Sequence, residues 1–177
     1  MPQAMEAAIP AGFTEGGVSP IVSERVVRTL ERIPPRGGPI RLLVVQAEKA
    51  KPEALEELLK KKMRWAMKKK APGVFEVEAL PADVDELALQ TALIRRLDLA
   101  TRFFGARVEG EEQKAVAAVT VDDAAAARKG LAGLGAEVKS EEAGPTLVVS
   151  IPGKALASLA VASWVRAVEI REAGKGK

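Results

Sequence analysis

The chain of 177 residues contains no histidine, no cysteine and no tyrosine. Without histidine it lacks the usual general base near neutral pH, and without cysteine it lacks a thiol nucleophile and most zinc or copper ligation. Carboxylate-only or Ser/Lys chemistry stays open, but no Gly-rich phosphate loop, nucleophile elbow or spaced acidic calcium loop is present to carry it. We therefore expect a protein that is not an enzyme and that uses no cofactor and no metal.

Aromatic residues are also scarce, at two Trp and four Phe. Leu, Val and Ala must fill the core, and the lack of cysteine excludes a disulfide scaffold. The first twenty residues lack the basic start and continuous apolar run of a secretion signal, and no later run is long enough to span a bilayer. We therefore expect a cytoplasmic location and no membrane partner.

The first part of the chain divides into two segments. Residues 1–38 begin with a Gly-, Pro- and Ala-rich stretch that we expect to be flexible, followed by a segment that could form a short helix. Residues 39–110 predict a smaller β-α-β-α domain of unknown role. Its strands are predicted over 40–46 and 74–78, its helices from Pro52 to the turn at Pro72 and from Asp83 to about Phe104, with a last short strand near 106–109.

Residues 114–177 give a clearer pattern. Strands are predicted over 114–121, 136–143, 146–151 and 165–170, and helices after the capping pair Asp122-Asp123 and over 155–163. The order β-α-β-β-α-β predicts an α+β fold of the split βαβ, ferredoxin-like kind, in which two helices cover one face of a four-stranded sheet. Strand alternation then places Val168 and Ile170 toward the helices and Glu169 on the open face.

Two motifs in this region narrow its function. The run Ile151-Pro-Gly-Lys-Ala-Leu-Ala-Ser-Leu159 is followed by Val165-Arg-Ala-Val-Glu169. Together they resemble the prodomains of subtilisin-type serine proteases, which end in a Leu-containing helix and a strand of pattern V-x-x-V-E. The resemblance covers residues 114–177. It implies a stand-alone inhibitor or folding chaperone of a subtilisin-like serine protease.

The resemblance also implies a binding mode. Such prodomains lay the open sheet face across two surface helices of the protease, and the acid of V-x-x-V-E meets helix N-termini, where free N–H groups and the helix dipole favour a carboxylate. The residues after Ile170 would leave the strand and enter the substrate cleft as an added strand. The implied protease-binding residues are Glu169, Arg171, Glu172, Ala173, Gly174, Lys175, Gly176 and Lys177.

Two alternatives to protease binding stay open. A basic stretch within 52–70 surrounds an aromatic residue, and a basic helix with an exposed aromatic could bind nucleic acid or an acidic protein. The candidate residues are Lys61, Arg64, Trp65, Lys68 and Lys69. Nucleic acid is the less favoured partner, because the predicted strands carry no aromatic residues for stacking on bases. A structural homo-oligomer formed through the open sheet face is the third possibility, and the oligomeric state is not predicted.

Overall fold

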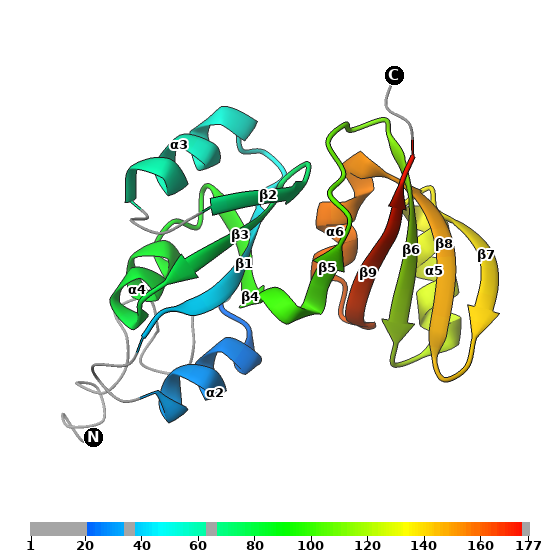
Figure 1. Ribbon diagram of the computed structural model, residues 1–177, viewed down its shortest axis with the longest axis horizontal. Helices are drawn as coiled ribbons and strands as arrows, with labels where there is room; N and C mark the ends of the chain where they lie inside the picture. The colour runs from blue at the N-terminus through cyan, green and yellow to red at the C-terminus, as the bar shows by residue number, and fades with distance from the viewer. Residues whose placement is uncertain (1–20, 34–37, 63–66, 175–177) are drawn as a thin grey trace. The chain divides into compact units, whose positions relative to one another are not determined.

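The computed structural model describes residues 21–33, 38–62 and 67–174, and has a mixed α+β fold with two β-sheets (Figure 1). The chain divides into two compact units. The first comprises the described residues up to Lys68 together with Glu76–Leu99, and the second comprises Lys69–Phe75 and Ala100 onward. The predicted flexible segment, residues 1–20, lies outside the described residues. In the described part of the chain, no helix has the length and apolar character needed to cross a membrane.

The first sheet has the strand order β2-β3-β1-β4, with β1 and β4 antiparallel. A short helix precedes it, begun by Ser23, whose side-chain oxygen accepts a hydrogen bond from the backbone N–H of Val26. The elements are α2 (Glu24–Arg32), β1 (Ile40–Gln46), α3 (Pro52–Lys62), β2 (Met67–Ala71), β3 (Val74–Ala79), α4 (Pro81–Ala88) and β4 (Ile94–Leu99).

The predicted β-α-β-α order of residues 39–110 is wrong, because two strands were taken for helix. The helix predicted from Pro52 ends at Lys62, and β2 follows it. The helix predicted to reach Phe104 ends at Ala88, and β4 follows it. In both places apolar residues recur at helical spacing, but short apolar runs do not distinguish a buried strand from a helix. Residues 40–99 therefore follow the order β-α-β-β-α-β.

The second unit contains a five-stranded sheet with the order β5-β9-β6-β8-β7. Strand β5 pairs parallel to β9, and the remaining pairs are antiparallel. The predicted strand at 106–109 is replaced by β5, which lies earlier in the chain. The elements are β5 (Phe103–Gly105), β6 (Lys114–Val121), α5 (Ala124–Gly133), β7 (Glu137–Glu142), β8 (Thr146–Pro152), α6 (Leu156–Val161) and β9 (Val165–Ala173), with short 3₁₀ turns at Ala100–Arg102 and Gly153–Ala155.

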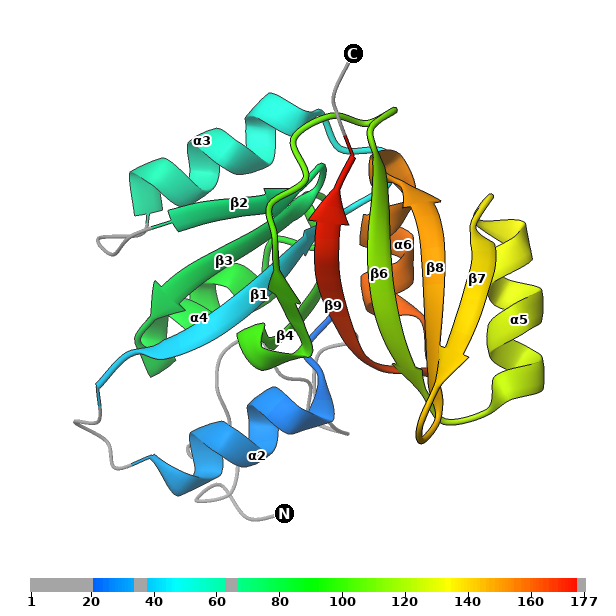
Figure 2. The same cartoon turned by 45° about the vertical axis from the view of Figure 1, so that its right-hand side comes forward.

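Helices α5 and α6 lie on the same side of the second sheet (Figure 2). Successive side chains of each strand point to opposite sides of the sheet. The set that faces the two helices is buried, and the opposite set is more exposed. The core residues from the strands are Ala115, Ala117, Val119, Leu147, Val149, Ile151, Val168 and Ile170, each at most 3% exposed. Leu131, Leu156 and Leu159 of the two helices are fully buried. The other set includes Glu169, as the alternation in the sequence predicts.

Candidate docking surface on the second sheet

Glu169 does not stand alone on the side of the sheet away from α5 and α6. Its Oε1 accepts a hydrogen bond from Arg171 Nε at 3.1 Å. The same guanidinium makes a two-pronged pair with Glu142 of β7, in which Nη2 donates to Oε1 at 2.7 Å and Nη1 donates to Oε2. We call these three residues the acid–arginine network. Two carboxylates and one guanidinium leave it with one net negative charge.

A β-bulge explains how Arg171 reaches this position. Val116 of β6 pairs with Glu172, but the next residue, Ala117, pairs with Ile170, so Arg171 is the extra residue on β9. Such bulges change the direction of a side chain relative to a regular strand. Beside β9, small residues such as Ala118 occupy the same side of β6. The bulge and these small neighbours give the long Arg171 side chain room to reach Glu142.

The pairing shifts the titration of both partners. The hydrogen bonds from Arg171 lower the pKa of Glu142, and those to Glu142 and Glu169 raise the pKa of Arg171. A lowered carboxylate pKa stabilises the folded state above the ordinary pKa of glutamate, about 4.3. That contribution is lost as the pH falls through the lowered pKa, because the carboxylate then becomes protonated.

We therefore expect the Glu142→Gln substitution to lower the free energy of unfolding at pH 7, by an amount that shrinks as the pH falls below the ordinary pKa of glutamate. Urea denaturation of both proteins between pH 7 and pH 2.5 measures the difference at each pH. A difference that stays constant down to pH 2.5 would contradict the role assigned to the charged Glu142–Arg171 pair.

The residues predicted to leave the strand after Ile170 remain in the sheet. Strand β9 continues to Ala173, with Glu172 and Ala173 paired to Val116 and Ala115 of β6. Gly174 N donates to Lys114 O at 2.6 Å, and Gly174 O accepts a hydrogen bond from the Gln113 side chain. The tail predicted to be free therefore does not begin before Lys175. Lys175, Gly176 and Lys177 lie outside the described residues.

The first unit contains the same strand pairing as the second. The five pairs between β1 and β4 match five consecutive pairs of the seven between β6 and β9, and a β-bulge lies at the same point in both sets. The pairs are Leu42–Leu99, Leu43–Asp98, Val44–Leu97, Val45–Arg96 and Gln46–Ile94 in the first unit, and Ala117–Ile170, Ala118–Glu169, Val119–Val168, Thr120–Ala167 and Val121–Val165 in the second. Asp98 of the first unit is therefore the structural counterpart of Glu169.

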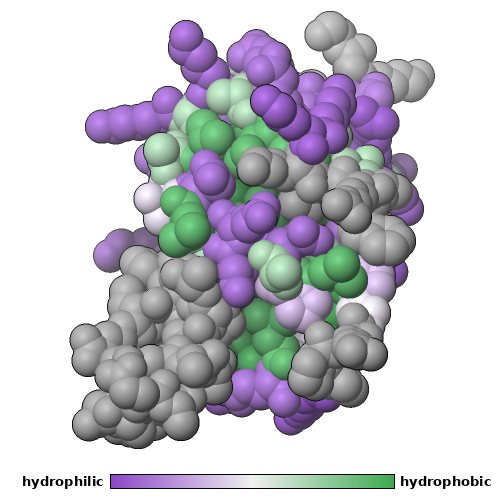
Figure 3. Space-filling view, turned by 90° about the vertical axis from the view of Figure 1, so that its left-hand side faces the viewer, coloured by the Kyte–Doolittle hydropathy of each residue, from purple (hydrophilic) through white to green (hydrophobic). Residues whose placement is uncertain are grey.

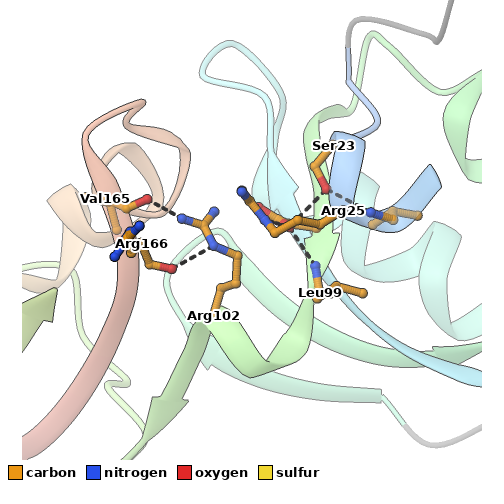
Figure 4. Close-up of polar contacts among 8 residues, drawn as sticks. Ser23, Arg25, Leu99, Arg102, Val165 and Arg166 are labelled. Carbon is orange, nitrogen blue, oxygen red and sulfur yellow. Dashed lines mark hydrogen bonds and ion pairs between the residues drawn. The ribbon is translucent and has the colours of Figure 1, made fainter. Parts of the chain in front are cut away.

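The bulge is stabilised alike in both units. The bulged residue is an arginine each time, and it pairs with an acid in the turn that follows the first strand. Arg95 Nη1 lies 2.7 Å from Glu48 Oε1, and Arg166 Nε lies 2.5 Å from Asp122 Oδ1. In the second unit a further residue, Arg102, donates hydrogen bonds to the carbonyl oxygens of Val165 and Arg166 (Figure 4). These contacts position the start of the strand that carries the acid.

Asp98 meets the N-terminus of a helix. The carboxylate is completely buried and accepts hydrogen bonds from Ser23 Oγ at 2.9 Å and from Leu99 N at 2.8 Å. Arg25 Nε and Nη2 donate to its two oxygens at 3.2 and 3.0 Å. Ser23 is the N-cap of α2, and Arg25 lies in its first turn (Figure 4). The first unit thus places its acid against the start of a helix from the same chain.

A signal for this second acid was present in the sequence. Residues 80–99 align with residues 151–170 without a gap, which matches Pro81 with Pro152 and Asp98 with Glu169. The strands read Ile-Arg-Arg-Leu-Asp-Leu and Val-Arg-Ala-Val-Glu-Ile. The sequence interpretation missed this repeat, because it treated residues 83–104 as one helix.

The predicted basic helix is divided between two elements. Lys61 is exposed at the end of α3, whereas Lys68 and Lys69 belong to strand β2. Arg64 and Trp65 lie outside the described residues. On the side of the molecule drawn in Figure 3, the described surface mixes hydrophilic side chains with smaller hydrophobic patches. The single basic helix face on which the nucleic-acid alternative depended is therefore not formed.

Comparison with known proteins found no match to any family model, to any curated protein or to any solved structure.

Proposed function

We propose that the second unit is a docking module that binds a subtilisin-like serine protease and inhibits it, and that it also assists the folding of that protease. The chain order of elements and the strand order β9-β6-β8-β7 support a ferredoxin-like assignment for this unit. The sheet side away from α5 and α6 is the proposed contact surface, and Glu169 is its central acid. The chain itself would act by binding, without catalysis or a cofactor.

The observation that carries this proposal is the position of Asp98. In the first unit, the acid at this place in the last strand lies against a helix N-terminus. The same strand register in the second unit gives Glu169 an equivalent place. Its network has a net negative charge, which suits the positive end of a helix dipole. We therefore propose that Glu169 receives the N-terminus of a protease helix.

The contacts within the network support a specific binding step for the proposed complex. Glu169 has one hydrogen bond from Arg171, whereas Glu142 has two. On docking, Glu169 would turn toward the N–H groups of the partner helix, and Arg171 would remain paired with Glu142. Arg171 is thus a positioning residue, which neutralises one of the two acids and keeps the other available.

The segment proposed to enter the substrate cleft must begin later in the chain than the sequence predicted. Residues up to Gly174 are hydrogen-bonded at the sheet, so the inserted segment begins at Lys175 or requires β9 to separate from β6 at its end. A chain that ends at Gly174 tests insertion and keeps the whole of β9. A chain that ends at Ile170 would also remove Arg171, so it would not separate the two effects.

We expect the Glu169→Gln substitution to weaken inhibition of a subtilisin-like protease by about 10- to 100-fold. This range corresponds to the loss of one or two charge-assisted hydrogen bonds to the protease. The measurement is the inhibition constant in a peptide-hydrolysis assay. Glu137→Gln is the matched control, since it removes an exposed carboxylate of the same unit outside the network. Equal inhibition by all three proteins would exclude Glu169 from the interface, and no inhibition by the folded wild type would exclude the function.

A further inference from the structure

Helix α2 lies outside the series of elements that the two parts of the chain share. The elements from β1 to β4 follow the same order as those from β6 to β9, with the same strand register and the same bulge. In the second unit the segment between β5 and β6, residues 106–113, contains no helix. The second unit therefore forms this arrangement without a counterpart of α2, and the arrangement itself does not require one.

The contacts that hold α2 are concentrated at its N-terminus. Val26 is the one residue of the helix that is fully buried, and Glu24, Arg25, Arg28, Glu31 and Arg32 are exposed. Ser23 and Arg25 donate side-chain hydrogen bonds to Asp98 at this end of the helix. A helix with one fully buried residue, attached mainly at its N-terminal end, can detach at a lower cost than a helix in the core.

The segment just before α2 is held by β4. Ser23 N donates to Leu97 O at 2.9 Å, and Leu97 N donates to Ile21 O at 2.6 Å, so Val22 forms a parallel bridge with Leu97. In the second unit β5 occupies the corresponding edge, where Phe103 pairs with Val168. The first unit thus recognises a short extended segment followed directly by a helix with a hydroxyl N-cap and an arginine in its first turn.

We propose that Asp98 and the edge of β4 form a second helix-binding site, which α2 occupies as a detachable cover. When α2 leaves, water solvates the carboxylate, and the Leu97 backbone groups become available to another chain. The occupant of the opened site is a segment of α2 chemistry: two or three extended residues, then Ser at the N-cap and Arg two positions later. This inference concerns the first unit and does not depend on protease binding by the second.

The first test measures hydrogen exchange in the full chain by mass spectrometry. In the Ser23→Ala/Arg25→Ala double variant, the buried Asp98 carboxylate would lose the side-chain hydrogen bonds from Ser23 and Arg25. We expect α2 amides to lose protection by roughly 100-fold, a change that matches the cost of an unpaired buried charge, while β1 and β4 stay protected. Arg28→Ala is the control, because Arg28 pairs with Glu24 on the exposed side of the same helix.

Two outcomes of the exchange experiment would overturn the proposal. If β1 and β4 lose protection together with α2, the helix is an integral part of the first unit. If α2 keeps its protection in the double variant, the Asp98 contacts do not hold it in place.

The second test asks whether the opened site binds a helix in trans. A fluorescein-labelled peptide of residues 21–33 is titrated with the full chain, and binding is followed by fluorescence anisotropy. We expect at least about tenfold tighter binding to the double variant than to the wild type, and loss of that gain when Asp98→Asn is added. Equal binding to all three proteins, or no binding to any, would overturn the second site.

Discussion

Replacing Asp98 with alanine should lower the free energy of unfolding of the first unit by about 3 kcal/mol, because it removes a buried acid that accepts hydrogen bonds from four donors. Ser23 Oγ and the Leu99 amide would lose their charged acceptor in a region that water does not reach. Urea denaturation followed by far-UV circular dichroism measures the loss.

Glu169→Ala is the matched control for this substitution, since it changes the counterpart position in the second unit. The Glu169 side chain is 41% exposed, and its pair with Arg171 is a surface contact. We expect a change of about 0.5 kcal/mol or less. Equal losses for the two variants would show that the acid has the same structural role in both units, which would argue against Glu169 as an interface residue.

Replacing Gly105 with alanine should lower the free energy of unfolding of the second unit by about 3 kcal/mol or more. Gly105 has a φ of +104°, which side-chain-bearing residues rarely adopt, and an added Cβ would overlap the backbone carbonyl of Ile170. The substitution would therefore separate β5 from β9, since Gly105 and Ile170 are register partners.

The Gly144→Ala substitution separates the effect of backbone strain from the effect of the overlap with Ile170. Gly144 also has a positive φ, +78°, but a Cβ there would meet open space. We expect this control to lose about 1 kcal/mol from backbone strain alone. Both variants can be compared by urea denaturation in a Trp65→Phe background, in which Trp164 is the single tryptophan and its fluorescence reports on the second unit. A loss at Gly105 no larger than that at Gly144 would contradict the overlap with Ile170.

The strands and helices of residues 114–170 could be predicted from the sequence, because the local signals there agree with one another. Alternating apolar residues mark β6 and β8, Asp123 caps α5, and Gly135 follows that helix with a φ of +75°. The first unit could not be predicted in the same way. The residues of β2 are mostly lysine, and those of β4 are spaced as in a helix, so local pattern favoured the wrong element in both places.

Local sequence predicts which side of the sheet Glu169 occupies, but it does not predict the burial of Asp98. Alternation along β9 places Glu169 opposite the buried Val168 and Ile170, which is a local property of a strand. Nothing local indicates that Asp98 is fully buried, because its partners Ser23 and Arg25 lie more than seventy residues earlier in the chain. The same is true of the Arg171–Glu142 pair, which joins strands β9 and β7.

The sequence by itself determined the absence of histidine and cysteine chemistry and the strands and helices of residues 114–170, whereas the repeat that relates Asp98 to Glu169 was recognised only from the strand registers. The tertiary structure decided that β9 continues to Ala173, that a bulge directs Arg171 toward Glu142, and that α2 meets Asp98. The physical reason is that hydrophobic periodicity and capping act over a few residues. Strand register, bulges and the burial of a charge depend on partners that only the folded chain brings together.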